Sequence, residues 1–260
     1  MATLYRKYRP QTFADLVGQL HVRTTLLAEL SGDVVAHAFL FVGPRGVGKT
    51  TTARLLAKAV NCAKPKNGEP DNVCQSCVAM NEGRSLDLIE IDAASHTQVD
   101  HVREHILPAA RTAPSIGRFK VFIIDEVHML SISAFNALLK VLEEPPAHVI
   151  FILATTEAHR LPATIISRCQ RFDFRRVGLE DTVKRLTHVL EEEGVRADRA
   201  VLERISRLSQ GSLRDAESML GQLVGLGEKH LTVDLADVVL PRSDMQGALT
   251  LFEQIVHRQT

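Results

Sequence analysis

The sequence predicts an α/β fold, in which a doubly wound parallel sheet is followed by a small all-helical domain. Short apolar, β-rich runs alternate with helical stretches from about residue 38 to 175, which is typical of a parallel sheet covered by helices. A glycine-rich turn joins the first of these strands to a helix. After Gly178 the β signal disappears, and apolar residues recur at helical spacing.

The elements are short and bounded by turn residues. The expected strands are Phe39 to Val42, Leu86 to Ile91, Lys120 to Asp125, Val149 to Ala154 and Arg171 to Phe174. The expected helices between them are Gly48 to Val60, Gln98 to Leu107 and Ser131 to Leu142, the last with Ser131 or Ser133 as its N-cap. Further helices are expected over Leu179 to Glu193, Asp198 to Leu208, Gly211 to Leu226, Thr232 to Val239 and Met245 to His257.

Composition limits the function classes. The 260 residues include 31 basic and 31 acidic side chains, so a strongly basic nucleic-acid-binding module is excluded and any contact with DNA must be local. The longest apolar runs are too short to span a bilayer, and the charged N-terminus is unlike a signal peptide. A cytoplasmic protein is expected. Its four cysteines suggest a metal site or core thiols more than a disulfide framework.

The strongest motif is a phosphate-binding loop. Residues 43–50 read GPRGVGKT, which fits G-x-x-x-x-G-K-[ST] between an expected strand and an expected helix. In such a loop, backbone N–H groups surround the phosphates, Lys49 reaches the β/γ oxygens and Thr50 ligates Mg²⁺. The alternative is a purely structural glycine-rich turn. The expected nucleotide-binding residues here are Gly43, Gly46, Val47, Gly48, Lys49, Thr50 and Thr51.

Two acids end a later apolar strand. The run KVFIIDEVH occupies residues 120–128. Asp125 is expected to hold Mg²⁺ through its water shell, and Glu126 to act as the general base for the attacking water. Taken alone, two acids after a strand are also consistent with a solvated turn. Behind a phosphate-binding loop, they predict ATP hydrolysis rather than mere binding.

Several further motifs carry a family resemblance. They are YRKYRP (5–10), VGQ (17–19), DEVHML (125–130), FNALLK (135–140), EEPP (143–146), ATT (154–156), SRC (167–169) and GSLRDA (211–216). In this order, over roughly residues 1 to 242, the chain resembles the gamma/tau family of bacterial DNA polymerase III clamp-loader subunits, which are AAA+ ATPases. The resemblance implies an ATP-hydrolysing motor that loads the sliding clamp onto primed DNA.

The resemblance also implies roles for residues outside the phosphate-binding loop. Thr156 matches sensor 1, with Thr155 next to it as the candidate for a merely buried hydroxyl. Arg214 matches sensor 2, which reaches the phosphates from the helical domain. Arg168 matches an arginine finger that acts in trans on the neighbouring subunit's ATP, and its structural alternative is a surface ion pair. The implied adenine pocket consists of Tyr8, Pro10, Val17 and Gly18.

The same family suggests a domain plan and a zinc site. It implies an AAA+ nucleotide-binding domain over 1–177 with a cysteine-containing insertion at about 61–80, a helical lid over 178–242, and the start of a collar domain over 243–260. Cys62, Cys74 and Cys77 occupy three positions that hold structural zinc in relatives, and Asp71 stands where the fourth cysteine should be. A carboxylate can complete such a site. The alternative is that the metal has been lost and the three thiols are free or buried.

The implied partners are delta, delta prime, further gamma/tau copies, the sliding clamp and primer-template DNA, in a nucleoid-associated complex without a membrane. DNA contacts would come from Arg103 and Lys140, with His96, Thr97 and Gln98 nearby. Competing readings are a non-hydrolysing scaffold subunit, another AAA+ remodeller and, remotely, a small-molecule P-loop kinase. The intact loop and acids favour the motor over the scaffold.

Overall fold

The computed structural model describes residues 3–32, 35–95, 104 and 106–240, and these form two compact units. One unit is Tyr8–Gly178, and the other combines residues 3–7 with 179–240. The predicted domain boundaries stay predictions. Two expected segments, the helix over Met245 to His257 and most of the helix over Gln98 to Leu107, lie outside the described residues.

The first unit is built on a five-stranded sheet in the order β2-β3-β4-β1-β5. All neighbouring strands are parallel. The strands are β1 (Ala38–Val42), β2 (Leu88–Asp92), β3 (Lys120–Asp125), β4 (Val149–Thr155) and β5 (Gln170–Asp173). The predicted α/β class is confirmed, and β3 has the predicted bounds.

The register makes the carboxyl ends of β1, β3 and β4 meet at one edge. Val42 of β1 pairs with Thr155 of β4, and Ile124 of β3 pairs with Leu153. All residues of β4 are buried, as expected for a central parallel strand covered on both faces. The segments that follow β1, β3 and β4 in the chain therefore lie close together at this edge of the sheet.

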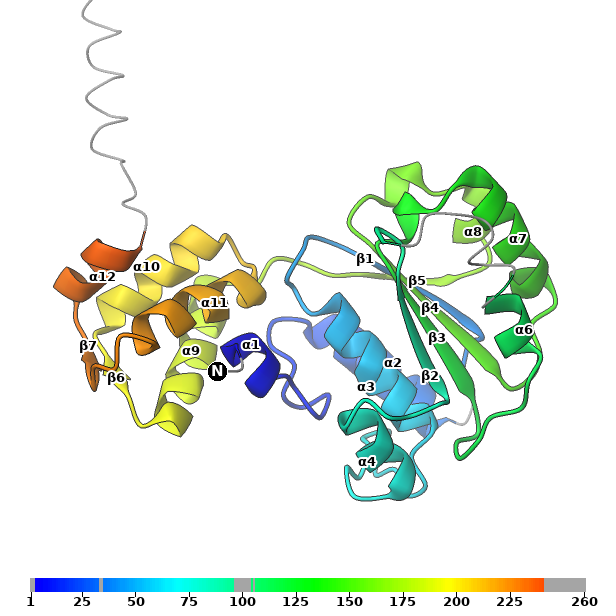
Figure 1. Cartoon of the computed structure of the whole chain (residues 1–260), viewed down its shortest axis with the longest axis horizontal. Helices are drawn as coiled ribbons and strands as arrows, with labels where there is room; N and C mark the ends of the chain where they lie inside the picture. Colours follow the sequence, from blue (N-terminus) through cyan, green and yellow to red (C-terminus); the bar gives the residue numbers. More distant parts are fainter. Residues whose placement is uncertain (1–2, 33–34, 96–103, 105, 241–260) are drawn as a thin grey trace, which may run out of the picture. The chain divides into compact units, whose positions relative to one another are not determined.

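Helices cover both faces of the sheet (Figure 1). On one face lie α2 (Leu20–Ser31) and α3 (Lys49–Val60), and on the other lie α6 (Leu107–Ala110), α7 (Ile132–Glu143) and α8 (Ala163–Ile166). Side chains along β3 alternate between the two apolar cores: Phe122 packs with the α7 side and Val121 with the α3 side. Phe122 also stacks on Phe151, with ring centroids 5.1 Å apart.

Local signals explain where some helices begin. The Ser131 hydroxyl accepts a hydrogen bond from the N–H of Ala134 at 3.2 Å, so Ser131 rather than Ser133 is the N-cap of α7. Helices α2, α8 and the short α4 (Gln75–Asn81) had not been expected in this unit, and α6 begins only at Leu107, the last residue of the helix expected over Gln98 to Leu107. Only Val22 and Leu26 of α2 are buried, which gives that helix a weak apolar pattern in sequence.

The second unit is a helical bundle. It contains α1 (Leu4–Lys7), α9 (Leu179–Glu193), α10 (Arg199–Ser209), α11 (Leu213–Val224) and α12 (Val233–Val239). The structure adds a parallel pair of two-residue strands, β6 (Arg196–Ala197) and β7 (His230–Leu231). Inside the bundle, Arg185 donates to Glu217 at 2.7 Å, and both side chains are buried. None of the helices in the described ranges is both long and apolar enough to cross a membrane.

The loop before β3 is closed by one buried carboxylate. Asp87, 2% exposed, accepts the backbone N–H groups of Ser115, Ile116 and Gly117 at 2.5, 2.8 and 2.8 Å. Although burial acts in the opposite direction, these donors hold the pKa of Asp87 below its ordinary value. The ionised carboxylate thus stabilises the connection that leads into the central strand.

We predict that Asp87→Ala lowers the free energy of unfolding by on the order of 3 kcal/mol at pH 7, because three buried donors lose a charged acceptor. The pKa is lower in the folded state, so this stabilisation is present above the unfolded pKa of about 4 and is lost as the pH falls below it. Urea unfolding at pH 7 and pH 3 measures both effects. The exposed Glu144→Ala is the control; an equal loss in the two variants contradicts the assignment.

Candidate functional site

The phosphate-binding loop connects β1 to α3, and two of its glycines are required by geometry. A Cβ on Gly43 would lie 2.5 Å from the carbonyl oxygen of Phe174, so no larger residue fits there. Gly48, directly before α3, has φ +107°, a conformation that side chains rarely adopt. The loop therefore turns tightly and presents the N-terminus of α3 at the carboxyl edge of the sheet.

Lys49 lies inside this loop. It is 6% exposed, and its Nζ donates to the carbonyl oxygens of Gly43 and Pro44 at 2.7 and 2.8 Å. Burial lowers the pKa of Lys49, while the charges of Glu126 and Asp125 act to raise it. The ammonium is thus held by loop carbonyls beside two carboxylates, where a phosphate could replace the carbonyl contacts.

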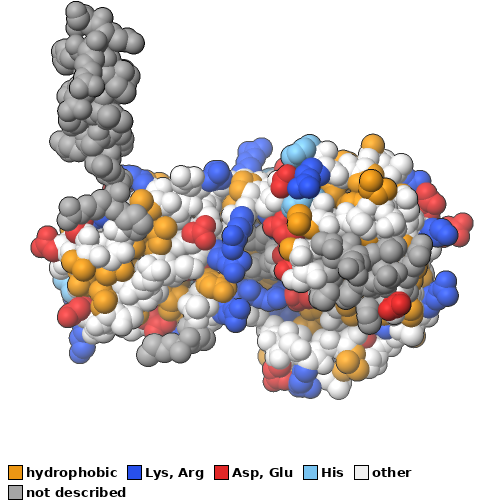
Figure 2. Space-filling model, turned by 45° about the horizontal axis from the view of Figure 1, so that its top comes forward, with side chains coloured by type: hydrophobic (Ala, Val, Ile, Leu, Met, Phe, Trp, Pro, Cys, Tyr) orange, Lys and Arg blue, Asp and Glu red, His pale blue; other side chains and the backbone are white. Residues whose placement is uncertain are grey.

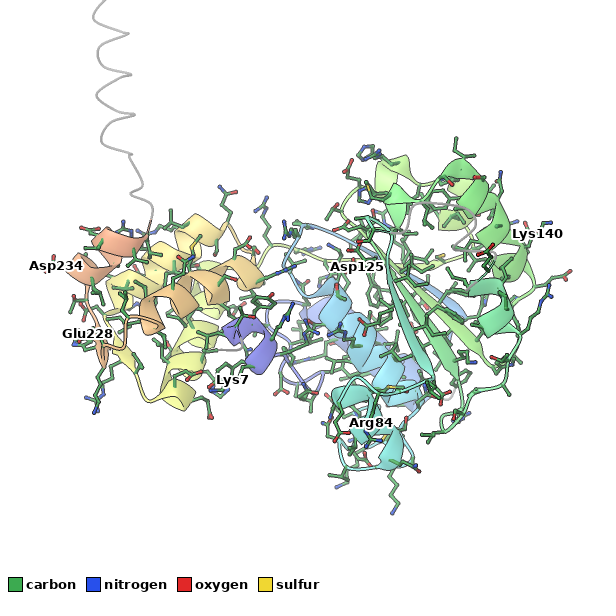
Figure 3. All side chains as sticks on the ribbon, viewed as in Figure 1. Lys7, Arg84, Asp125, Lys140, Glu228 and Asp234 are labelled. Carbon is green, nitrogen blue, oxygen red and sulfur yellow. The ribbon has the colours of Figure 1, made fainter. Side chains whose placement is uncertain are left out.

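Thr50 and Asp125 meet across the sheet edge. The Thr50 hydroxyl donates to Asp125 Oδ2 at 2.6 Å, and Asp125 Oδ1 accepts the N–H of Glu126 at 3.0 Å. Figure 3 shows Asp125 near the N-terminal end of α3. A hydroxyl and a carboxylate at one point are hard oxygen ligands, which suit Mg²⁺. The residues present therefore fit the expected metal.

Glu126 has an unusual backbone and a specific partner. Its φ is +47° and its ψ 44°, in the left-handed region that non-glycine residues rarely adopt. The Thr156 hydroxyl donates to Glu126 Oε2 at 3.1 Å. The neighbouring Thr155 is fully buried, and its hydroxyl accepts the N–H of Glu157 at 3.0 Å. Of the two threonines, Thr156 is the one that contacts the acid.

The residues expected at the adenine belong to the segment before α2. Among them Gly18 is exposed, whereas Tyr8, Pro10 and Val17 are half-buried. The next residue, Gln19, belongs to the VGQ motif, but no role had been predicted for it from sequence.

Gln19 is 1% exposed and links this segment to two others. Its side-chain nitrogen donates to the carbonyl of Arg175 at 2.6 Å and, more weakly, to that of Val47 at 3.5 Å, and its oxygen accepts the N–H of Arg175 at 3.1 Å. This buried amide fixes the segment against the phosphate-binding loop.

The two arginines expected to sense phosphate have other partners in this chain. Arg168 donates to the carbonyl of Thr164 at 2.8 Å and forms an ion pair with Glu143 at 2.7 Å, with a third of its side chain exposed. Arg214, in the helical unit, is exposed, and its guanidinium lies 5.0 Å above the Tyr5 ring. A cation over an aromatic face is attracted to it.

The three cysteines and Asp71 converge. One ligand atom from each of Cys62, Asp71, Cys74 and Cys77 lies within 4.8 Å of all the others. Asp71 Oδ1 accepts the N–H groups of Cys74 and Val73, each at 3.1 Å, and the Cys74 donor is the main reason that the pKa of Asp71 is lowered. Burial raises the pKa values of Cys62 and Cys77. The structure thus brings together the four ligands that the sequence predicts for zinc.

A buried lysine anchors this insertion. Lys58 is 3% exposed, and its Nζ donates to the Gln11 carbonyl at 2.8 Å, to Asn72 Oδ1 at 2.6 Å and to Asn81 Oδ1 at 2.9 Å. The carboxylate of Glu69 accepts N–H groups from the segment before α2 as well. The insertion is therefore attached to the sheet unit by contacts that do not involve the cysteines.

Of the residues expected to contact DNA, only Lys140 lies within the described ranges. Arg103, His96, Thr97 and Gln98 lie outside the described residues. Lys140 is exposed on α7, on the side away from the sheet (Figure 3). On the face shown in Figure 2, acidic, basic and histidine side chains of the sheet unit stand side by side, in keeping with the formal net charge of zero.

Comparison with solved structures shows the same fold. The RuvB Holliday junction branch migration motor of Thermotoga maritima superposes with a TM-score of 0.65 at 19% identity, covering 89% of this chain and 72% of that one. At this identity the likeness concerns the fold alone. It confirms the predicted fold, in which a parallel sheet is followed by a helical domain.

Comparison with known sequences shows the family. Residues 18–178 match the family described as DNA polymerase III, delta subunit, and residues 182–229 match the clamp-loader subunit ATPase lid domain. DNA polymerase III subunit tau of Salmonella typhimurium is 49% identical over 97% of this chain, and that of Bacillus subtilis is 50% identical over 89%. The chain spans 39% and 41% of the length of these two relatives. It belongs to the gamma/tau family of DNA polymerase III clamp-loader subunits.

Proposed function

We propose that this chain binds ATP and Mg²⁺ and hydrolyses ATP as a motor subunit of the bacterial DNA polymerase III clamp loader, which places the sliding clamp on primed DNA. The observation that carries the proposal is the convergence of three features at one edge of the sheet. These are Lys49 in its loop, the Thr50–Asp125 pair and the Glu126–Thr156 pair. The match of residues 182–229 to a clamp-loader subunit ATPase lid domain supports the assignment of this chemistry to clamp loading.

Each of these side chains at the carboxyl edge of the sheet has a separate role. Lys49 exchanges its carbonyl contacts for β/γ-phosphate oxygens, and the N–H groups from Gly46 to Thr51 surround the phosphates. Thr50 and Asp125 hold Mg²⁺, which when bound neutralises phosphate charge. Glu126 accepts the proton of the attacking water, and Thr156 orients that carboxylate and senses the γ-phosphate.

Other residues couple the site to the assembly. Arg214 acts as sensor 2 from the helical unit, and Arg168 acts as an arginine finger toward the ATP of an adjacent subunit. Tyr8, Pro10 and Val17 contact the adenine, together with Gly18. The assembly contains delta, delta prime and further gamma/tau copies, and it works in the cytoplasm on nucleoid DNA.

A non-hydrolysing scaffold subunit is the second candidate. It is favoured by the match of residues 18–178 to a family described as a delta subunit. A scaffold has no need of a complete phosphate-binding loop or of a general base. The buried ammonium of Lys49 and the hydrogen-bonded Glu126 therefore favour the motor.

ATP hydrolysis by the full-length chain with its clamp-loader partners tests the proposal directly. The rate is expected to rise when sliding clamp and primed DNA are added. Binding of ATP without hydrolysis under all conditions would identify the scaffold. A hydrolysis rate that does not change when clamp and DNA are added would indicate another AAA+ remodeller. Phosphoryl transfer to a small molecule would indicate a kinase.

We also propose that the cysteine cluster holds one structural Zn²⁺. The ligand set consists of Cys62, Cys74, Cys77 and the second carboxylate oxygen of Asp71, since Oδ1 already accepts two N–H groups. Tetrahedral coordination at a Zn–S distance of about 2.3 Å requires ligand atoms roughly 3.8 Å apart, which the spacing within 4.8 Å supports. A closed four-ligand site has no catalytic role.

A first prediction about the proposed function separates ATP binding from ATP hydrolysis. Lys49→Ala is expected to abolish tight ATP binding, because it removes the main side-chain counter-charge to the phosphates. Glu126→Gln is expected to bind ATP normally and to hydrolyse it at least about 100-fold more slowly. Calorimetry with a non-hydrolysable analogue and steady-state kinetics measure the two effects, with Glu144→Gln as an exposed control. Wild-type hydrolysis by Glu126→Gln would remove Glu126 from the role of base.

The second prediction concerns the arginine finger. Arg168→Ala is expected to leave ATP binding nearly intact and to lower hydrolysis in the assembled complex roughly 1000-fold. Arg171→Ala, which removes another exposed arginine paired with an acid, should have little effect. In complexes that mix Arg168→Ala with Lys49→Ala subunits, activity should return only at interfaces where two intact halves meet. Activity independent of the arrangement contradicts action in trans.

The third prediction concerns zinc. Elemental analysis of protein purified without chelator is expected to give one zinc per chain, released as the pH falls because protons compete for the thiolates. Asp71→Cys should tighten binding, since a thiolate replaces a hard oxygen. Cys74→Ser should lower zinc content and thermal stability but spare ATP binding, because Lys58 anchors the insertion independently. Substoichiometric zinc that added metal does not restore overturns the site.

A further inference from the structure

His128 is a buried histidine that the proposed chemistry leaves without a task. It lies in the short 3₁₀ helix η2 (Val127–Met129), two residues after Glu126, and only 5% of its side chain is exposed. A buried imidazole is costly unless both ring nitrogens have polar partners. The partners of this ring therefore indicate why a histidine occupies the position.

Both nitrogens face polar atoms of the catalytic edge. Nδ1 lies 3.0 Å from the Thr155 hydroxyl and 3.5 Å from Glu126 Oε2, and Nε2 lies 3.3 Å from Glu157 Oε1. Thr155 ends β4, and Glu157 precedes η3 (Ala158–Arg160). The ring thus bridges the loop after β3 to the segment after β4.

The last residue of β4 and the two residues that follow it divide their contacts between Glu126 and His128. Thr156 donates to Glu126 Oε2 at 3.1 Å, while Thr155 and Glu157 contact the ring. Oε2 of Glu126 consequently has the Thr156 hydroxyl and the His128 ring as neighbours. A histidine that only filled the core would not need a carboxylate near each nitrogen.

Glu126 needs such support. Its left-handed backbone, with φ +47°, costs about 1–2 kcal/mol relative to ordinary conformations. Fixing a glutamate side chain costs up to about 2 kcal/mol more in rotamer entropy. Neighbouring groups must therefore hold both the backbone turn and the carboxylate in place.

We propose that His128 is a positioning residue for the general base. It holds Glu126 through Nδ1, and Thr155 and Glu157 fix the ring in turn, so the carboxylate is aligned with the end of β4, where Thr156 acts. This inference rests on the proposed ATPase function. It assigns to the histidine of the DEVH segment a role in orienting Glu126 rather than in binding nucleotide.

Two near-isosteric substitutions separate positioning from packing. In His128→Asn the amide stands near the position of Nδ1, so contacts with Thr155 and Glu126 are kept. In His128→Gln the amide stands near the position of Nε2, so only the contact with Glu157 is kept. His128→Ala removes both. The full-length chain in its clamp-loader complex is used, with kcat, KM and binding of a non-hydrolysable ATP analogue measured for each variant.

His128→Ala is expected to lower kcat roughly 10- to 100-fold, as a misplaced catalytic group does, with KM and analogue affinity changed less than about twofold. His128→Asn should recover most of kcat, and His128→Gln should not. If His128 had a purely structural role, all three variants would lose thermal stability, and His128→Asn and His128→Gln would have the same kcat. Unchanged kcat in His128→Ala, or equal kcat in Asn and Gln, overturns the proposal.

Crystal structures without nucleotide supply a readout that does not depend on activity. The Glu126 carboxylate is expected to leave the Thr156 hydroxyl in His128→Ala and His128→Gln and to stay in His128→Asn. An unmoved carboxylate in all three refutes positioning even if the unaltered complex hydrolyses ATP. If the unaltered complex hydrolyses none, the proposed function fails, and these structures still decide whether His128 holds Glu126.

Discussion

The parallel register of β1, β4 and β3 is the constraint on which the candidate site depends. Because Val42 pairs with Thr155 and Ile124 with Leu153, three segments far apart in sequence leave the sheet at the same edge. The hydrogen bond from Thr50 to Asp125 crosses that edge between residues 75 positions apart. A one-residue slip of β3 would turn its side chains to the opposite faces and move both acids away from the phosphate-binding loop. The buried strands and both apolar cores therefore support function by fixing the register.

Much of this arrangement could be predicted from sequence, because its determinants are local. Continuous apolar runs identified the central strands, with β3 predicted to the residue, and the loop motif identified Lys49 and Thr50. Other features depend on tertiary contacts. Helix α2 buries only Val22 and Leu26, so it lacks a clear periodic signal. Gln19 and His128 read as ordinary polar residues until the segments that supply their partners are placed beside them.

The polar side chains of the candidate site are paired with one another or with backbone groups. Lys49 is bound by loop carbonyls, Thr50 by Asp125, and Glu126 by Thr156. Each of these contacts uses an atom that the proposed chemistry assigns to phosphate, Mg²⁺ or water. Binding of nucleotide must therefore exchange internal hydrogen bonds for ligand contacts rather than fill unpaired groups. Such an exchange costs little, because a buried polar group is expensive only when it is left unpaired.

Arg168 is also paired within the chain. In a single chain its guanidinium is held by Glu143, the last residue of α7, and by the carbonyl of Thr164. An ion pair that is a third exposed or more stabilises by at most about 1 kcal/mol, whereas a guanidinium that meets transition-state phosphate charge contributes several times more. The Glu143 contact is thus weak enough to be exchanged for phosphate, as the proposed role of Arg168 in trans requires. Glu143 ends the helix that follows Asp125 and Glu126, so the proposed finger is paired with the same segment that carries the proposed general base.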